Sequence, residues 1–242
     1  MNYQDSNAYA SPYSGQMAAD AAEQDRIGFI QRTYLHLGLA ILAFVTLEAV
    51  IFTAIPEETL MGLAGTLTQG WNWAFVLGGF MGASWIATRW AESGASSTKQ
   101  YMGLMLFVVA EAIIFVPILA IAQFQVGGQV IESAAITTLV TFGGLTGFVF
   151  IGRFDFSFMR MFLFLGGILA FGLIICSILF GFNLGTWFAV AMVALASGFI
   201  LYQTSNVLHH YRTDQSVAAS LALFSSLATL FYYVLILFMR RD

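Results

Sequence analysis

Long apolar runs separated by short polar stretches make up most of this chain. Each run has about 20 residues, and an α-helix of that length crosses a hydrocarbon core of roughly 30 Å. The runs lie at about residues 33–55, 71–90, 101–122, 134–152, 161–180, 187–208 and 217–239. The pattern predicts an all-α membrane protein, folded as a bundle of seven transmembrane helices.

The composition agrees with this class. Hydrophobic residues make up 59% of the 242 positions and charged residues only 9%, whereas a soluble domain has about 25% charged residues. The apolar runs are continuous, which excludes the alternating strands of about ten residues that form outer-membrane barrels. The nine basic residues are scattered along the chain, so we expect the lipid bilayer as a partner and no nucleic acid.

Two polar segments flank the first apolar run. Residues 1–25 contain neither Lys nor Arg and no apolar core, so we expect no signal peptide there. Their composition predicts a disordered cytoplasmic tail or a short surface helix around residues 17–30, followed by a transmembrane domain over residues 26–242. After the first run, Pro56, Gly62 and Gly65 predict a loop that leads to the second run.

Lys and Arg fall on alternate sides of the predicted membrane. Seven of the nine precede the first run or lie in every second loop, namely Arg26, Arg32, Arg89, Lys99, Arg153, Arg160 and Arg212. Because basic residues gather on the cytoplasmic side, we predict a cytoplasmic N-terminus. Arg240 and Arg241 are the exception, since seven crossings place them outside. The last helix either carries them across or re-enters without crossing, and we favour seven crossings.

Small residues at four-residue spacing predict close contacts between helices, because they let two backbones approach each other. The pairs are Gly78 and Gly82, Gly143 and Gly147, and Ala194 and Gly198. These pairs indicate a compact bundle and carry no chemistry of their own.

Two carboxyl groups lie inside the apolar runs, where an ionisable group is costly and often functional. Glu48 lies in the first run and Glu111 in the third, at depths that differ by roughly 8–9 Å from the helical rise. They form a candidate polar path that responds to protons or cations. Alternatively, each is protonated and bonded to a neighbouring backbone or hydroxyl group. Pro117 frees a carbonyl near residue 113, and that oxygen would suit a hard cation.

The sequence contains no catalytic constellation. It has no His-Glu-x-x-His motif, no Gly-x-Ser-x-Gly motif and no glycine-rich phosphate loop, and the apolar runs contain no Asp. The adjacent His209 and His210 point to different faces of a helix and make a poor metal site. We therefore expect no enzymatic activity, no cofactor and no bound metal.

Four segments resemble the Bax inhibitor family in its bacterial branch. They are residues 29–34 (FIQRTY), Glu111 with residues 117–119 (PIL), residues 153–158 (RFDFSF) and residues 198–202 (GFILY). The resemblance implies six helices around a central seventh, in the bacterial cytoplasmic (inner) membrane. It also implies a pH-sensitive leak of cations, calcium among them, and restraint of cell death or stress responses. Bacterial members are linked to a membrane protease.

The chain departs from the family at the residues that the resemblance assigns to the leak. The family has a pair of aspartates, one after the Tyr of the sixth helix and one in the seventh. Here Gln203 follows Tyr202, and Ser226 stands at the second position. Neither residue ionises, so the proton switch is not carried over. Instead we predict that Gln203 and Ser226 form an interhelical hydrogen bond that holds a closed state.

Two functions follow as hypotheses. The first is a Bax-inhibitor-like membrane protein that leaks cations passively, with Glu111 as its main polar contact. The alternative is a non-conducting regulator that binds membrane partners, such as a quality-control protease, through the N-terminal tail. A secondary transporter finds no support, because the two halves show no repeat and no matching pair of broken helices.

Overall fold

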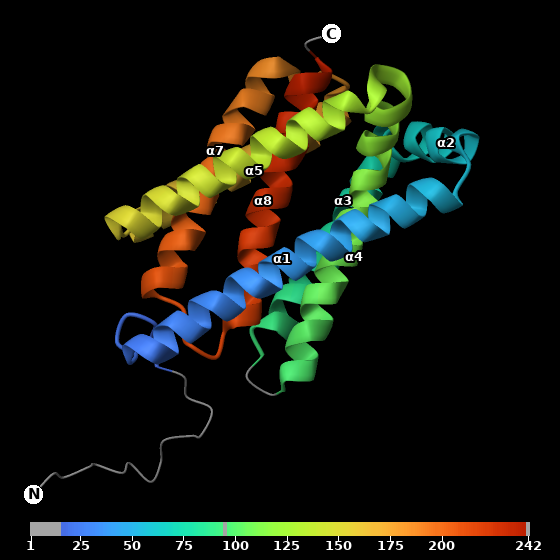
Figure 1. The fold of residues 1–242 in the computed structure, drawn as a ribbon. Helices are drawn as coiled ribbons and strands as arrows, with labels where there is room; N and C mark the ends of the chain where they lie inside the picture. The colour runs from blue at the N-terminus through green and yellow to red at the C-terminus, as the bar shows by residue number, and fades with distance from the viewer. Residues whose placement is uncertain (1–15, 94–95, 241–242) are drawn as a thin grey trace, which may run out of the picture.

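The computed structural model describes residues 16–93 and 96–240, and these residues are almost entirely helical (Figure 1). The elements are α1 (Glu23–Ala54), α2 (Glu57–Leu67), α3 (Gly70–Ala91), α4 (Ser97–Ile121), a π-helical turn (Ala122–Gly127), α5 (Gln129–Gly152), a 3-10 turn (Ser157–Met159), α6 (Arg160–Phe180), α7 (Gly185–His209) and α8 (Ser216–Met239). The all-α class is confirmed.

Six helices in the described residues are long and apolar enough to cross a membrane, namely α1, α4 with its π-helical turn, α5, α6 with its 3-10 turn, α7 and α8. The predicted number of seven is not confirmed, because α3 falls outside this group. With 22 residues α3 is as long as a membrane span. Its sequence is less apolar, however, since it includes Asn72, Ser84, Thr88 and Arg89.

The loop predicted after Pro56 is wrong, because residues Glu57–Leu67 form the helix α2. Glu57 and Glu58 lie in its first turn, where negative charge favours a helix. Leu60 and Ala64, one turn apart, are buried and pack in one cluster with Ala120, which lies on α4. This tertiary contact outweighs the helix-breaking tendency of the two glycines within α2.

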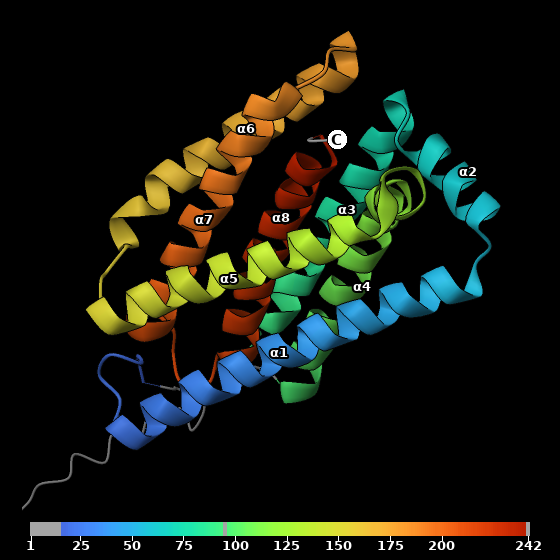
Figure 2. The same cartoon turned by 45° about the horizontal axis from the view of Figure 1, so that its top comes forward.

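Helix α8 lies at the centre of the bundle, as Figure 2 shows. It contacts α1, α3, α4, α5 and α7, while α6 packs on the outside against α7 and α3. Leu223, Leu230 and Leu235 on α8 are completely buried, and Phe44 and Phe107 stack edge-on against Phe224. A helix that is apolar all round is typical of such a buried position.

When α3 is counted with the six longer helices, successive helices alternate in direction, so the bundle has two ends (Figures 1 and 2). We name as proximal the end where α1, α4, α6 and α8 begin. The distal end is the one where these four helices finish.

Gly103 on α4 sets a close approach between α4 and α3. An added Cβ at Gly103 would lie 2.5 Å from the carbonyl oxygen of Ala87 and 2.7 Å from the amide nitrogen of Ala91. The two backbones therefore touch where a side chain would keep them apart. The prediction from small-residue spacing missed this position, which has no small partner four residues away.

The predicted small-residue contacts have mixed outcomes. A Cβ at Gly198 would lie 2.9 Å from the side chain of Leu163 on α6, so α7 and α6 approach closely there. Four other glycines have no atom within 4 Å of the Cβ position, and the contacts predicted at them are wrong: Gly78, Gly82, Gly143 and Gly147.

The predicted disordered tail falls largely outside the described residues, which start at 16. Met17 pairs with Arg212 in an antiparallel β-bridge, and Ala18 is completely buried. Helix α1 begins already at Glu23, so its first turns extend the predicted membrane span toward the proximal end.

Candidate functional site

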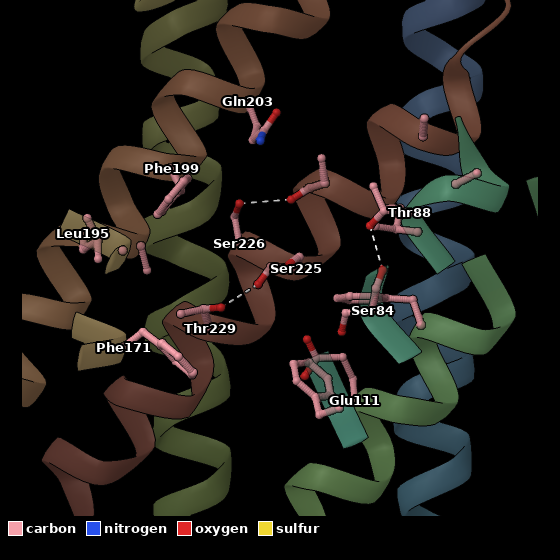
Figure 3. A pocket seen from close by; sticks show the side chains of 18 of the residues that line it. Ser84, Thr88, Glu111, Phe171, Leu195, Phe199, Gln203, Ser225, Ser226 and Thr229 are labelled. Atoms are coloured by element: carbon pink, nitrogen blue, oxygen red, sulfur yellow. Dashed lines mark hydrogen bonds between the residues drawn. The ribbon is translucent and has the colours of Figure 1, made fainter. Parts of the chain in front are cut away.

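A cavity of about 560 Å³ opens between α3, α4, α6, α7 and α8 (Figure 3). We name it the proximal cavity, because Glu92, next to the end of α3, and Tyr211, in the α7–α8 loop, line it at the proximal end. The polar side chains that line it deeper in the bundle are Ser84, Thr88, Glu111, Gln203, Ser225, Ser226 and Thr229. The cavity thus has hydroxyl, amide and carboxyl oxygens on several helices.

A second cavity of about 710 Å³, the distal cavity, extends to the other end of the bundle. Asn183 and Arg240 line it at the distal end, and Tyr232 and Tyr233 lie deeper inside. The two cavities share five lining residues, namely Phe80, Glu111, Ile174, Met192 and Thr229. The cavities are therefore adjacent inside the bundle, and we name the region of these five shared residues, which include Glu111, the junction.

Glu111 is held at this junction by the buried face of α4. Phe107 and Phe115 lie one turn before and one turn after it, and the ring of each packs against a phenylalanine ring of α8. Glu111 is only 5% exposed, and in the described part of the chain it has neither a hydrogen bond nor an ion pair. A buried carboxyl group without a protein partner needs a proton, a water molecule or a cation.

Glu48 is buried as well, but it lies elsewhere. Both of its carboxyl oxygens lack a hydrogen-bond partner among the described residues, and it lines neither cavity. On α1 it lies between Phe44 and Phe52, which are one turn away on either side and stack on residues of the α4 segment. Of the two glutamates predicted as one polar path, Glu111 lines the two cavities and Glu48 does not.

Hydroxyl groups on α3 and α8 complete the lining of the proximal cavity. Thr88 Oγ1 donates to the carbonyl of Ser84 at 2.9 Å, and Thr229 Oγ1 donates to the carbonyl of Ser225 at 2.9 Å (Figure 3). The Ser84 hydroxyl is buried without a partner among the described residues. Sequence reasoning missed this lining, although the four-residue spacing of these polar positions on each helix places them on one face.

Comparison with known proteins decides the family. Residues 26–242 match the family model described as inhibitor of apoptosis-promoting Bax1. The chain belongs to the Bax inhibitor family. The resemblance predicted from the sequence is therefore confirmed.

Two relatives illustrate the breadth of the Bax inhibitor family. An uncharacterized protein of Pseudomonas aeruginosa is 31% identical over 168 residues, which cover 67% of this chain and 72% of the relative. Bax inhibitor 1 of Schizosaccharomyces pombe is 30% identical over 145 residues, which cover 58% of this chain and 52% of that protein. The chain thus spans about half the length of the yeast protein that it matches.

Gln203 and Ser226, predicted at the positions of the Bax inhibitor family's aspartate pair, both line the proximal cavity, on α7 and α8 (Figure 3). Their hydrogen bonds stay within their own helices. Ser226 Oγ donates to the carbonyl of Ala222 at 3.0 Å, and Gln203 Oε1 accepts from Asn206 Nδ2 at 3.4 Å. The predicted interhelical bond between the two is not among the bonds of the described residues, because the serine hydroxyl bonds back to its own helix.

Asp155, in the connection between α5 and α6, ties that connection to the end of α7. Its Oδ1 accepts from the Ser157 amide at 2.8 Å and from Ser205 Oγ at 3.3 Å, and it lies 3.4 Å from His210 Nε2. The Ser157 amide is the main reason why the pKa of Asp155 falls to about 2. Sequence reasoning treated this aspartate only as part of a family motif.

The two adjacent histidines take different partners, as predicted. His209 Nδ1 lies 3.0 Å from the carbonyl oxygen of Ser205, whereas His210 faces Asp155. In the part of the chain that the structure describes, no group of three or more His, Cys, Asp or Glu side chains is arranged to hold a metal ion.

Proposed function

We propose that this member of the Bax inhibitor family is a passive leak for cations, with calcium as the expected permeant ion. One observation carries the proposal. Glu111 lines both cavities at their junction and has no protein partner in the described residues. An ion that passed from one cavity to the other would meet this carboxyl group. We propose no catalytic reaction for the protein.

The chemistry of the lining supports a hard cation. Hydroxyl and carboxyl oxygens are the ligands that calcium prefers, and they line the proximal cavity from α3, α4 and α8. Apart from Glu111 and Thr229, the residues that line both cavities are apolar, namely Phe80, Ile174 and Met192. Apolar constrictions limit the passage of ions by excluding water. This combination favours a slow leak over a fast channel.

The proposed path requires α3 to cross the membrane, which gives seven crossings, six of them around the central α8, and a cytoplasmic N-terminus in a bacterial inner membrane. Helix α3 packs along α4 and contributes Ser84 and Thr88 to the proximal cavity. A helix that faces a polar cavity can cross the membrane with fewer apolar residues than one surrounded by lipid. Reaction of a cysteine placed at residue 242 with an impermeant thiol reagent, after Cys176→Ser, would locate the C-terminus.

A flux assay in lipid vesicles tests the leak. Vesicles with the reconstituted protein and a calcium dye are compared for the wild type and for Glu111→Gln. We expect a flux that falls by about tenfold in the variant, which corresponds to roughly 1.4 kcal/mol of lost interaction with the ion. Glu48→Gln is the matched control, because Glu48 is buried but lies outside both cavities. Absence of flux in the wild type from about pH 5 to 8 would refute the leak.

The alternative, a regulator that binds a membrane partner such as a quality-control protease, gains support from one contact. Gln16 and Ala18 form backbone hydrogen bonds with the α7–α8 loop, so a partner that pulls on the residues before them would act on the bundle directly. Deletion of residues 2–15 tests this function. If the deletion left partner binding and turnover unchanged, the regulator function would be ruled out. The proposed cation leak does not depend on the result of this deletion.

A further inference from the structure

We propose that residues 16–18, which we name the N-terminal strap, hold the α7–α8 loop in place so that Tyr211 closes the proximal cavity. Release of the strap then opens the cavity at its proximal mouth. The strap is thus an autoinhibitory contact within the chain.

The strap binds the loop through its backbone. The Ala18 amide donates to the Tyr211 carbonyl at 2.8 Å, and the Thr213 amide donates to the Gln16 carbonyl at 3.0 Å. These two bonds flank the bridge between Met17 and Arg212. The Ala18 side chain is completely buried, whereas Gln16 and Met17 are exposed, so the strap lies along the surface and is anchored by Ala18.

A tight turn leads the strap directly into α1. The amides of Asp20 and Ala21 both donate to the Met17 carbonyl at 3.0 Å, and α1 starts at Glu23. The strap is therefore anchored on one side by a membrane-length helix. On its other side it is continuous with the N-terminal residues, where a partner or a protease would act.

The loop that the strap holds carries the closing residue. Tyr211 lines the proximal cavity together with Glu92, and its ring packs against the core of the bundle. Burial raises the pKa of the Tyr211 phenol, and the nearby charge of Glu92 raises it further, which agrees with an enclosed hydroxyl group. A side chain at this place shields the hydroxyl groups deeper in the cavity from water at the proximal end.

Two further hydrogen-bond contacts of the loop are longer than the strap bonds. Arg32 Nη2 on α1 donates to the Thr213 carbonyl at 3.4 Å, and His210 Nε2 lies 3.4 Å from Asp155 Oδ1. Both strap bonds are shorter, and hydrogen bonds weaken as they lengthen. Loss of the strap would therefore remove two of the stronger backbone contacts of the loop.

A thiol-accessibility experiment tests the closure. Cys176→Ser removes the one cysteine, and Ser225→Cys then places a thiol in the proximal cavity. The protein is kept in lipid nanodiscs, and the rate of reaction with a charged thiol reagent is measured. Ala18→Pro removes the amide that donates to Tyr211, and deletion of residues 2–18 removes the whole strap. We expect Ala18→Pro to raise the rate by about fivefold and the deletion to raise it by about 25-fold, since each lost backbone hydrogen bond accounts for a factor of roughly five.

Two controls isolate the effect of the strap. Ala22→Pro introduces the same residue four positions later, where φ is already −54° and the amide donates no bond among the described residues. It should leave the rate unchanged. A thiol at Ser177, which lines only the distal cavity, should react equally fast with and without the strap.

A covalent lock keeps the inference testable if Ala18→Pro folds poorly. Paired residues of an antiparallel bridge have Cα atoms about 4.5–5.5 Å apart, a distance that a disulfide can span. Met17→Cys with Arg212→Cys should therefore cross-link on oxidation and keep the Ser225→Cys thiol unreactive until reduction. An unchanged thiol rate after both Ala18→Pro and deletion of residues 2–18 would overturn the inference.

The closure rests on the proposed leak function only in its effect on ion flux. Thiol accessibility is measured without ion flux, so it tests the closure by itself. A calcium flux that rises in parallel with the thiol rate supports both. If the thiol rate rises while no flux appears, the strap closes the cavity but the leak function fails.

Discussion

Glu111 on α4 and Thr229 on α8 are the two polar residues of the described chain that line both cavities. They lie on opposite sides of the junction, as Figure 3 shows for the proximal cavity. The Thr229 hydroxyl donates its hydrogen to the Ser225 carbonyl, so its oxygen remains able to accept from water or to contact a cation. The junction thus presents one carboxyl group and one hydroxyl oxygen to anything that passes.

Replacement of Thr229 by valine tests the role of this hydroxyl. Thr229→Val keeps the shape of the side chain but removes the oxygen, so we expect calcium flux to fall by about threefold and stability to change by about 1 kcal/mol, the net contribution of one hydrogen bond. Flux in vesicles and thermal unfolding in detergent measure the two effects. Thr46→Val serves as the control, because Thr46 makes the same backbone bond on an exposed face of α1. Equal flux losses in both variants would contradict a specific role.

The contact at Gly103 predicts a large effect of a small substitution. Gly103→Ala would place a methyl group within 2.5 Å of the Ala87 carbonyl oxygen, and backbone atoms of α3 must move to make room. Overpacking of this kind costs about 1–3 kcal/mol. Thermal unfolding should therefore occur at a lower temperature than in the wild type. The control is Gly82→Ala on α3, where the added methyl group has open space, and this variant should unfold at the same temperature as the wild type. An equal fall in the unfolding temperature of both variants would contradict the role of close packing at Gly103.

The sequence predicted the membrane helices well because length and continuous hydrophobicity determine them locally. The predicted end of the first run at residue 55 and the predicted last run at residues 217–239 agree with α1 and α8 to within a residue. Helix α2 escaped it, because this helix contains glycines and follows a proline, and only its burial against α4 shows why it is helical. Helix α3 agrees with the predicted run at residues 71–90, although it is not among the six helices that are apolar enough to cross a membrane.

The site was predictable in part for a similar reason. A carboxyl group within an apolar run is rare enough to be noticed, and Glu111 does line both cavities. Glu48 carries the same signal, but it lines neither cavity, and sequence spacing does not show that. Ser84 and Thr229 carry no signal of their own, because hydroxyl residues are common in membrane helices. Only the packing of α3, α4 and α8 brings them together.

Restoring the aspartates of the Bax inhibitor family tests the proposed loss of its switch. Gln203→Asp combined with Ser226→Asp puts two carboxyl groups into the proximal cavity, on helices that face each other. When both are ionised they repel each other, and when one is protonated they can share a hydrogen bond. We expect calcium flux in the double variant to be about threefold higher at about pH 8 than at pH 6, beyond any difference in the wild type.

The comparison of single and double variants isolates the pair. Gln203→Asp and Ser226→Asp alone introduce one charge each, so neither should show the pH dependence of the double variant. Gln203→Asn combined with Ser226→Thr keeps both positions polar without charge and controls for altered packing. A pH dependence equal to that of the wild type in the double aspartate variant would show that these two positions do not act as a pair.

Asp155 predicts how the proximal end responds to acid. Its pKa lies near 2 in the folded protein, below the ordinary value of 3.8, so the unfolded chain takes up its proton first as the pH falls. Its stabilising contribution is therefore complete above about pH 5 and is lost as the pH falls through about 4 to 2. Thermal unfolding of the wild type and of Asp155→Asn should differ by a constant amount between about pH 5 and 7, and the difference should shrink below about pH 4. The same comparison in a His210→Gln background removes the side chain that lies 3.4 Å from Asp155 Oδ1, and most of the difference should remain there, because the Ser157 amide makes the shorter contact. A difference that persisted undiminished down to about pH 2 would contradict this account.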